Sequence, residues 1–359
     1  MQIQQQVQLA PLTTFKVGGP ARYFVEARSE EDVRTAVAEA QTRGWPLFVL
    51  GGGSNLVISD AGWPGLVLKI ALTGISQRRD GARMMFEAAA GEDWDGFVAH
   101  AVARGCAGIE CLSGIPGTVG GTPVQNVGAY GQEVADTITS VRVLDTTSGD
   151  FRELENADSG FAYRTSIFNT RERGRYIVLR LTFVLAPGGA ARIEYADLKR
   201  HFAGRSRPPT LAETREAVRA IRLSKAMLIV PGDDDCRSAG SFFKNPVLTH
   251  EAFERLQARV DPVPNFPAKD GMVKVAAAWL VEHAGFAKGL ERGPVGISRR
   301  HALAIVNRGG ATAADIVALK NEIQQGVLDE FGIQLQPEPV FVGFDQLNLV
   351  AANAAEEWP

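Results

Sequence analysis

The sequence predicts a mixed α/β (α+β) chain of two or three domains. Short apolar runs typical of buried strands alternate with amphipathic helical segments along most of its length. At 359 residues, with 45% hydrophobic residues, the chain is long enough for several cores. Its 38 Lys and Arg against 41 Asp and Glu give a net charge of −3, so we expect neither nucleic acid nor an anionic membrane as a partner.

The N-terminus and the cysteines indicate a cytoplasmic protein. The first eight residues have neither a basic segment nor an apolar core, and no apolar run approaches membrane-spanning length. Three cysteines (Cys106, Cys111 and Cys236) are an odd number, consistent with reduced thiols. Five scattered histidines show no metal-ligand spacing, so we expect no metal site. No feature indicates an obligate protein partner.

The first part of the chain predicts a small α/β lobe. Residues 22–27, 46–50 and 66–70 are strand-like, and Ser29 begins a helix that continues to about Gly44. Asp32 stands at the capping-box position of this helix. Its expected buried stripe consists of Val33, Ala36, Val37 and Ala40.

The middle of the chain predicts a second lobe, and the end a third α/β region. Residues 139–145 should form a hairpin with 151–154 across the turn at 146–149. Further strands are expected at 84–90, 176–185, 301–307 and 340–342, and helices at 93–104, 210–225, 273–284 and 312–331. A domain boundary is expected near 187–189 or after the helix at 210–225. Residues 346–359 resemble a loose tail.

Two uncharged glycine-rich loops point to a bound nucleotide. The first, residues 51–55, directly follows the strand at 46–50, and the second lies between Glu110 and Glu133. Glycine permits positive φ and close backbone approach, and successive amides in such loops form an anion-binding concavity. Leu56 replaces the third glycine of a Rossmann fingerprint, and the chain has no Gly-Lys pair for a P-loop. Taken alone, the second loop could equally be a surface turn.

Three residues carry candidate chemistry, and each has a plainer interpretation. Ser241 lacks the elbow of a serine hydrolase and could belong to a capped turn beside two core phenylalanines. Arg164, among apolar neighbours, could clamp a carboxylate or phosphate, or be paired structurally. Glu338 stands between two prolines before a strand, where a solvated glutamate is common. The acidic run at 233–235 could suggest a divalent cation, but a solvated loop is favoured because alternating ligand spacing is missing.

Seven motifs, in order along the chain, resemble those of the UDP-N-acetylenolpyruvoylglucosamine reductase (MurB) family. They lie at 14–19, 50–55, 115–121, 125–131, 163–168, 240–246 and 336–338. The resemblance implies a two-lobed FAD-binding domain of the PCMH, or vanillyl-alcohol-oxidase-like, type and a C-terminal α/β substrate-binding domain. The domains expected from it are flavin lobes at 1–73 and 74–224, with the tyrosine loop in the second, a substrate domain with a returning C-terminal strand at 225–345, and the tail at 346–359.

The resemblance also implies the reaction. NADPH would reduce non-covalently bound FAD and depart, and UDP-N-acetylglucosamine enolpyruvate would then be reduced to UDP-N-acetylmuramate for peptidoglycan synthesis. Arg164 and Glu338 would stabilise negative charge on the substrate carboxylate, with a proton on the acid, and Ser241 would protonate the ether-bearing carbon. The implied substrate ligands are Tyr163, Tyr195, Lys225 and Asn245. The implied flavin contacts are Gly51, Gly52, Gly53, Ser54, Asn55, Ile115, Pro116, Gly117, Thr118, Gly120, Gly121, Thr122, Val124, Asn126, Gly128, Ala129, Tyr130 and Ile177.

One departure and two rival functions remain. Many relatives carry Glu-Pro-Glu where this chain has Gln336-Pro-Glu, but Glu338 is the only carboxylate between Glu330 and Asp345. Another FAD-dependent oxidoreductase of the same fold, such as an oxidase, often attaches its flavin through His or Cys, and neither residue lies at 51–55 or among the glycines at 114–131. A non-catalytic nucleotide-sugar binder would have no reason to hold a flavin.

Overall fold

The computed structural model describes residues 1–260 and 262–344, and its contacts divide the chain into two compact units. The first unit comprises Met1–Val7, Ala21–Gly53 and Pro64–Leu228, and the second takes in Gln8–Pro20, Ser54–Trp63 and the chain from Ile229 onward. Two short segments of the second unit therefore come from the range expected for the first flavin lobe. The functional boundaries at 73/74 and 224/225 stay a prediction, and the expected tail at 346–359 lies outside the described residues.

A four-stranded sheet and one helix form the N-terminal part of the first unit. The helix α1 (Glu30–Thr42) begins as predicted, because the Ser29 hydroxyl accepts the Asp32 amide and the Asp32 carboxylate accepts the Ser29 amide. All four residues expected on its buried stripe are buried. The strands, in sheet order, are β1 (Gln4–Gln8), β2 (Pro20–Ala27), β5 (Trp63–Ile70) and β3 (Leu47–Leu50), with β3 parallel to β5.

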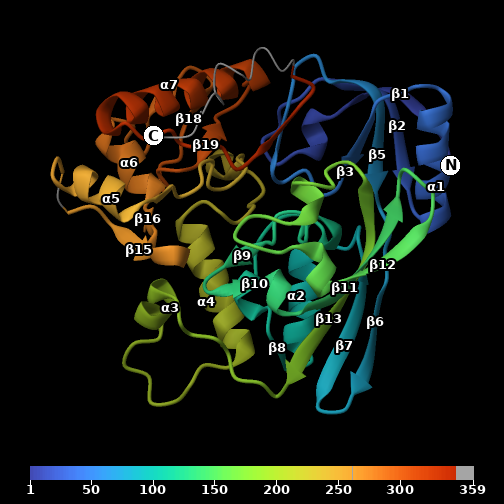
Figure 1. Ribbon diagram of the computed structural model, residues 1–359, viewed down its shortest axis with the longest axis horizontal. Helices are drawn as coiled ribbons and strands as arrows, with labels where there is room; N and C mark the ends of the chain where they lie inside the picture. The colour runs from blue at the N-terminus through green and yellow to red at the C-terminus, as the bar shows by residue number, and fades with distance from the viewer. Residues whose placement is uncertain (261, 345–359) are drawn as a thin grey trace. The chain divides into compact units, whose positions relative to one another are not determined.

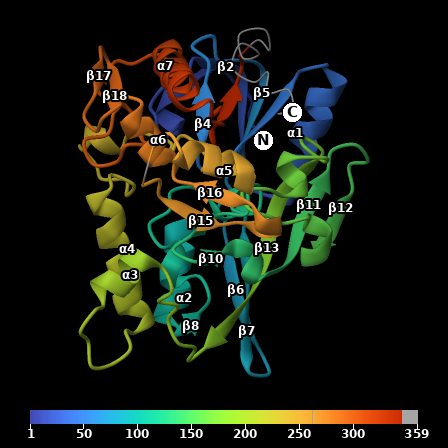
Figure 2. The same cartoon turned by 60° about the vertical axis from the view of Figure 1, so that its left-hand side comes forward.

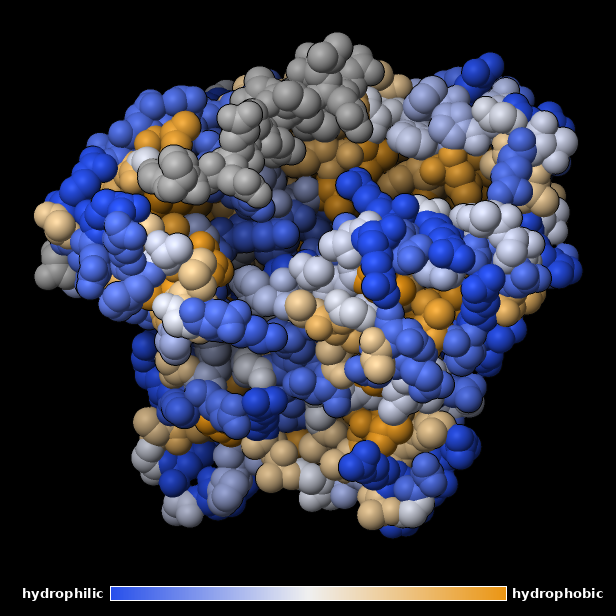
Figure 3. Space-filling model, viewed as in Figure 1, coloured by the Kyte–Doolittle hydropathy of each residue, from blue (hydrophilic) through white to orange (hydrophobic). Residues whose placement is uncertain are grey.

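A larger antiparallel sheet belongs to the same unit (Figure 1). The predicted hairpin is confirmed: Gly149, at φ 74°, donates its amide to the Asp145 carbonyl over 2.8 Å and closes the turn. Figure 3 shows hydrophilic and hydrophobic side chains interspersed on the face of the molecule seen in this view. Arg142 of the hairpin pairs with Glu153 of the neighbouring strand and with Glu30 of α1. In sheet order the strands are β12 (Phe151–Glu155), β11 (Ile138–Asp145), β13 (Tyr176–Pro187), β7 (Arg83–Ala89) and β6 (Ile75–Asp80), and β8 (Cys106–Ala107) pairs with the end of β13.

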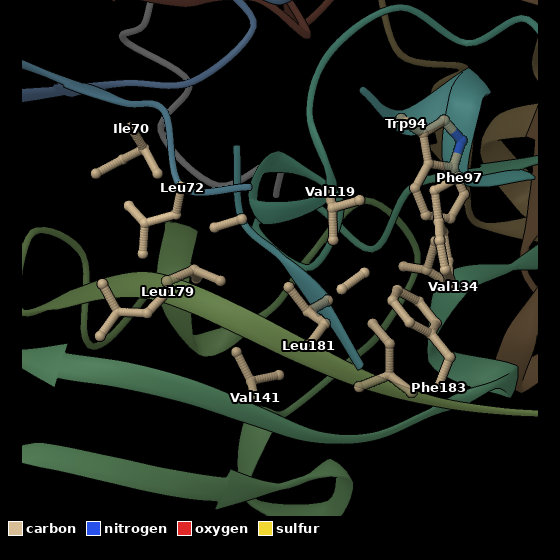
Figure 4. Close-up of a cluster of buried hydrophobic side chains, with 14 of the residues drawn as sticks. Ile70, Leu72, Trp94, Phe97, Val119, Val134, Val141, Leu179, Leu181 and Phe183 are labelled. Atoms are coloured by element: carbon tan, nitrogen blue, oxygen red, sulfur yellow. The ribbon is translucent and has the colours of Figure 1, made fainter. Parts of the chain in front are cut away.

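The helix α2 (Trp94–Ala103) packs aromatic side chains against this sheet (Figure 4). Leu179, Leu181 and Phe183 alternate along β13 and so face the same side of the sheet. The ring of Phe183 lies 4.9 Å from that of Phe97 and 6.0 Å from that of Trp94, measured between centroids. Burial of each such side chain contributes about 1.5–3 kcal/mol to the free energy of folding. The segment that follows α2 is therefore attached to a well-packed core.

Two further helices of the first unit share a small separate core. The helix α4 (Leu211–Ser224) begins with a capping box formed by Thr210 and Glu213, and α3 (Ala196–His201) lies beside it in Figures 1 and 2. We call the residues that join them the satellite cluster: Cys111, Tyr130, Leu198, Phe202, Ala217 and Val218. Because Cys111 and Tyr130 lie near the two ends of the long glycine loop, this cluster connects the loop to both helices.

Within its described residues, the second unit contains three α-helices and several short strands. Its parallel pair joins β4 (Leu56–Ile58) to β20 (Val340–Val342), a strand found where the sequence predicts it. Three-stranded sheets are formed by β14 (Val247–Leu248), β16 (Val273–Val275) and β15 (Asn265–Pro267), and by β17 (Glu291–Arg292), β18 (Val295–Ile297) and β19 (Ile305–Asn307). The helices are α5 (His250–Gln257), α6 (Ala277–His283) and α7 (Ala313–Phe331).

Two expected elements of this unit were wrong in part. The helix expected at 273–284 begins only at Ala277, because residues 273–275 form the central strand between β14 and β15. The strand expected at 301–307 is reduced to β19, since residues 301–304 turn: the Ala304 amide donates to the His301 carbonyl over 3.1 Å. In both places pairing with distant strands decided the structure, and apolar periodicity could not reveal it.

Side-chain hydrogen bonds attach the early segments to the second unit. The Asp60 carboxylate accepts the amides of Ala313 and Ala314 at the start of α7, over 2.7 and 3.0 Å. The Asn307 side chain donates to the Phe15 carbonyl over 2.9 Å. Short 3-10 helices complete the fold: η1 (Ala10–Leu12), η2 (Glu110–Leu112), η3 (Val119–Gly121), η4 (Val134–Asp136), η5 (Asn156–Ser159), η6 (Ile167–Asn169), η7 (Asp234–Cys236) and η8 (Lys269–Gly271). Among the described helices, none combines the length and apolarity needed to cross a membrane.

Candidate active site

The long glycine loop is fixed to the core of the first unit by backbone hydrogen bonds. The Gly117 carbonyl accepts the Trp94 amide over 3.1 Å, and the Gly120 amide donates to the Ala90 carbonyl over 2.8 Å. A Cβ on Gly120 would lie 2.5 Å from the Ala90 Cβ, so only glycine fits there. These bonds fix residues 117–120 to the core, so this part of the loop is not a free surface turn, whereas Gly121 is exposed.

The two glycine loops, far apart in the sequence, meet in the first unit. A Cβ on Gly52 would lie 2.5 Å from the Gly117 Cα, and one on Gly51 would lie 3.0 Å from the Thr118 hydroxyl oxygen. Real Cβ atoms essentially never approach other atoms as closely as 2.5 Å. The absence of side chains in both loops therefore allows their backbones to touch and to form one combined surface.

Polar groups at this junction are left for a ligand. The Thr118 hydroxyl is buried and has no hydrogen-bond partner within residues 1–260 and 262–344. Over the same described ranges, the amides of Gly52, Gly53, Gly117 and Thr118 donate to no other residue. An unpartnered buried polar group costs about 1–3 kcal/mol, so acceptor atoms of a bound molecule are expected here. The phosphates and polar chain of FAD provide such acceptors, and these loops fit that cofactor.

Hydrogen bonds hold the segment that carries Arg164 against the long glycine loop. The Asn126 side chain donates to the Ala162 carbonyl over 3.1 Å, and the Ser166 hydroxyl donates to the Val124 carbonyl over 2.6 Å. These two bonds, one on each side of Arg164, fix the segment at two points. Both bonds use side chains of the motifs, so the local sequence itself produces the attachment.

Arg164 lies directly beside the loop. Its Nη1 atom is 3.6 Å from the place that a Cβ of Gly128 would occupy. Its φ of 55° is a left-handed conformation that a non-glycine residue seldom adopts, and such strain is typical of functional positions. The guanidinium carbon lies 5.5 Å from the centroid of the Tyr163 ring, within cation–π range. The structure thus brings two predicted site residues next to the predicted flavin loop.

Three other predicted ligand residues gather at the satellite cluster. Tyr195 caps the start of α3, and its ring lies 5.4 Å from that of Tyr130 in an edge-on arrangement. Tyr195 is 45% exposed whereas Tyr130 is 8% exposed, and burial raises the pKa of Tyr130 to about 12. The Lys225 Nζ atom lies 2.6 Å from an oxygen of Asp197. Tyr195 and Lys225 are thus joined through the short helix α3.

Arg222 and Asp95, which sequence reasoning missed, fix the entrance of the long glycine loop. Arg222 is buried and donates to the carbonyls of Gly114, over 2.9 Å, and Met227, over 2.7 Å. The Gly114 amide in turn donates to Asp95 over 2.6 Å. Burial lowers the pKa of Arg222. The sequence signal was its position four residues after Val218, on the buried face of α4, where an arginine is unusual unless it has buried hydrogen-bond partners.

In the second unit the structure brings Ser241, Glu338 and Asn55 together. Phe242, the neighbour of Ser241, accepts the Glu338 amide at its carbonyl over 2.8 Å. The Asn55 side chain donates to the Glu338 carbonyl over 3.2 Å, and the Asn55 carbonyl accepts the Val340 amide over 2.9 Å. Asn55 was predicted to contact flavin, and the structure gives it a role in holding the glutamate segment. The hydroxyl of Ser241 has no hydrogen bond with a described residue.

Several other predicted ligands have structural partners of their own. The Asn245 side-chain oxygen accepts the Ala277 amide over 2.9 Å, which leaves its NH2 group for a ligand. The Thr122 hydroxyl donates to the Val119 carbonyl over 2.7 Å. The contacts of these residues with flavin or substrate stay a prediction, as do those of the core residue Ile177 and of Ile115, Val124 and Ala129, which pack against the core.

The acidic run at 233–235 is an ion-pair cluster, so both the cation interpretation and the solvated loop were wrong. Asp235 is 2% exposed and accepts hydrogen bonds from Ser298, over 2.7 Å, and Arg308, over 2.7 Å. Arg300 bonds to both Asp233 and Asp235. Burial opposes ionisation, but these bonds lower the pKa of Asp235 to about 2. Within the described ranges, no three His, Cys, Asp or Glu residues are placed to hold a metal ion.

Asp235→Ala should destabilise the second unit by about 3–5 kcal/mol, because the buried Arg308 would lose its near charge partner at 2.7 Å and keep, among the described residues, only Asp234 at 4.0 Å. The folded-state pKa of about 2 lies below the ordinary 3.8, so the contribution is present above pH 4 and is lost as the pH falls toward 2. Thermal unfolding at pH 7 and at pH 3 measures both effects. Equal melting temperatures of variant and parent at pH 7 would contradict this prediction, and Asp329→Ala on the exposed end of α7 is a matched control.

Comparisons with known proteins agree with this architecture. A family model described as an FAD binding domain matches residues 21–155, and one described as the UDP-N-acetylenolpyruvoylglucosamine reductase C-terminal domain matches 231–342. The UDP-N-acetylenolpyruvoylglucosamine reductase of Streptomyces coelicolor is 50% identical over 348 residues, which cover 93% of this chain and 89% of that protein. The protein of the same name from Thermobifida fusca is 46% identical over 94% of this chain and 97% of its own length.

A solved structure gives the same result. The crystal structure of UDP-N-acetylenolpyruvylglucosamine reductase (MurB) from Thermus caldophilus matches with a TM-score of 0.64 at 26% identity, over 95% of this chain and 99% of that one. The agreement extends over nearly the full length of both chains, in sequence and in fold. The chain therefore belongs to the UDP-N-acetylenolpyruvoylglucosamine reductase family, with the FAD-binding domain and the C-terminal domain that its sequence predicts.

Proposed function

We propose that this protein is an FAD-containing enzyme that uses NADPH to reduce UDP-N-acetylglucosamine enolpyruvate to UDP-N-acetylmuramate, a step of peptidoglycan precursor synthesis. Relatives of nearly full length that are named as the reductase support this proposal. The structural observation that carries it is the hydrogen bond between the backbones of Phe242 and Glu338. Through it a serine hydroxyl and a carboxyl group, the donors that this reduction requires, belong to one small assembly.

The two glycine loops would hold FAD without a covalent bond. The amides of Gly52, Gly53 and Gly117 and the hydroxyl of Thr118 are the free donors at their junction. Bound there, FAD supplies the hydride for the enolpyruvyl double bond. The protein contributes orientation through the backbone bonds that fix the long glycine loop. Neither loop contains a Lys or Arg of its own.

The reacting group of the substrate would be controlled by three side chains. Arg164 binds the substrate carboxylate, and Glu338, in its protonated form, donates a hydrogen bond to the same group. Together they stabilise the negative charge that spreads into this carboxylate when the methylene carbon is reduced. The Ser241 hydroxyl then gives its proton to the ether-bearing carbon. Its lack of a hydrogen bond to other described residues is consistent with a hydroxyl that faces substrate.

The remaining polar residues would bind the rest of the substrate. Lys225 and the NH2 group of Asn245 are suited to its phosphates or carboxylate. Tyr163 and Tyr195, with exposed rings, offer flat surfaces for its sugar or base. We also propose a cytoplasmic location, supported by the three cysteines, which are free and buried.

The absorption spectrum of the purified protein tests this function first. A bound flavin gives a yellow protein, NADPH bleaches it without oxygen, and the enolpyruvyl sugar nucleotide restores the colour. A flavin oxidase would recover its colour with oxygen but not with this substrate. A colourless protein that cannot be reconstituted with FAD would contradict the proposal. So would a reduced flavin that the enolpyruvyl substrate does not reoxidise.

Gly121→Asp should abolish flavin binding while the protein still folds. The structure has open space around Gly121, with no atom within 4 Å of an added Cβ, so the side chain itself is tolerated. Its negative charge would lie in a loop that we assign to phosphates. Flavin absorbance per protein and circular dichroism measure the two effects separately. Gly121→Ala is the matched control, and full flavin content in a folded Gly121→Asp variant would show that the loop assignment is wrong.

A further inference from the structure

The ammonium group of Lys225 already has a carboxylate partner. Its Nζ atom lies 2.6 Å from Asp197 Oδ2, and both side chains are partly accessible to solvent. The other oxygen of Asp197 lies 3.6 Å from Arg200, whose side chain is largely exposed. A partly exposed ion pair is weak, typically below 1 kcal/mol, so a better anion can exchange with its carboxylate.

The short helix α3 links this carboxylate to a second predicted ligand. Asp197 lies two residues after Tyr195, which caps the helix. Leu198 and Phe202 attach the helix to α4 through the satellite cluster, and the Lys225–Asp197 pair is a further attachment at its N-terminal end. Figures 1 and 2 show α3 beside α4 in both views. An anion that takes Lys225 from Asp197 therefore removes one of the attachments of the helix end that carries Tyr195.

We propose that Asp197 is the resident counterion of Lys225 and must be displaced by an anionic group of the substrate, which makes Asp197 a specificity-determining residue. This inference rests on the proposed function, because it uses Lys225 as a substrate ligand. Asp197 competes with every anion for the Lys225 ammonium group. Only an anion with more than one charge or acceptor pair has enough binding free energy to replace the Asp197 carboxylate. The resident carboxylate thus favours a diphosphate or a diphosphate with a carboxylate, and disfavours weakly charged ligands.

Asp197→Asn is the direct test, because it removes the charge and keeps the shape. We expect the Kd of UDP to fall roughly 2- to 5-fold, which corresponds to the loss of a competing, partly screened ion pair of below about 1 kcal/mol. Uridine, which has no phosphate, should bind with unchanged affinity. Calorimetry or quenching of flavin fluorescence gives both constants. Glu216→Gln, which removes one negative charge from α4 two turns before Lys225, is the matched control and should change neither Kd.

The full substrate extends the test to turnover. Asp197→Asn should lower its KM by a similar factor, with flavin content unchanged. If UDP also binds more tightly, the phosphates replace Asp197; if only the full substrate does, its carboxylate is the replacing group. Asp197→Ser provides a second variant should the asparagine disturb α3, as judged by circular dichroism.

Three results would contradict these ideas, two of them the counterion role alone and the third the proposed function. A parent protein that binds UDP through Lys225, as shown by weaker binding to Lys225→Met, combined with Asp197→Asn and Asp197→Ser variants that bind neither UDP nor the full substrate more tightly, would overturn the counterion role alone. Weaker binding to these Asp197 variants would also overturn it, since Asp197 would then orient the lysine for the substrate. A parent protein that binds neither UDP nor the enolpyruvyl substrate would instead contradict the proposed function.

Discussion

Ser241→Ala should separate the two halves of the catalytic cycle. Reduction of the flavin by NADPH should proceed at a near-normal rate, because no carbon atom is protonated in that step. Reoxidation by UDP-N-acetylglucosamine enolpyruvate should slow by about 10²–10⁴-fold, the usual effect of removing a general acid. The Ser241 hydroxyl bonds to no other described residue, so its removal breaks no structural bond. Stopped-flow absorbance of the flavin measures both steps in one instrument.

The control for this experiment is a serine whose hydroxyl also lacks a structural partner. Ser76 on β6 is exposed, and Ser76→Ala should leave both half-reactions unchanged. Equal slowing of both half-reactions by Ser241→Ala would indicate a structural serine. A normal reoxidation rate would mean that another donor delivers the proton, and the proposed role of Ser241 would then be wrong.

Arg164→Met and Glu338→Gln should each slow reoxidation by the substrate about 10²–10³-fold, as loss of a preorganised group that stabilises developing charge typically does. Flavin content and oxidation of NADPH should survive in both variants. The structure describes Arg164 beside the glycine loop of the first unit and Glu338 beside Ser241 in the second. Their action on one substrate carboxylate is therefore a hypothesis about the assembled enzyme, which kinetics can test.

The double variant provides that test. Because both side chains would act on the same charge, it should lose less free energy of activation than the sum of the two single losses. Strict additivity would show that the residues serve separate tasks, and the shared-carboxylate model would be abandoned. Arg171→Met, at an exposed arginine of the same region, controls for the lost positive charge and should leave reoxidation unchanged.

Local signals in the sequence were sufficient where structure is decided locally. The capping box of Ser29 and Asp32 fixed the start of α1, and the turn before Gly149 predicted the β11–β12 hairpin. Neither depends on a distant residue. The wrong elements, by contrast, are strands at 273–275 and 305–307 whose extent is decided by partners elsewhere in the second unit.

The same division applies to the site. Motifs predict Ser241, Arg164 and Glu338 as site residues, because glycine, proline and small polar residues leave recognisable patterns. They could not reveal that Asn55 holds the Glu338 segment, a contact across 283 residues. Nor could they reveal Arg222, which positions the loop by donating hydrogen bonds to two backbone carbonyls. Side chains that position others through backbone atoms have no characteristic spacing, so only coordinates identify them.

Gly114 has both of its backbone polar groups held, the amide by Asp95 and the carbonyl by Arg222. The start of the long glycine loop is therefore held in its conformation by hydrogen bonds within the protein, without help from the cofactor. Little conformational entropy remains to be lost there when FAD arrives. Protein stripped of its flavin should consequently retain the near-ultraviolet dichroism of its aromatic core and recover the cofactor in a single second-order phase. Reconstitution of the apoenzyme would then be limited by encounter between the two molecules rather than by rearrangement of the chain.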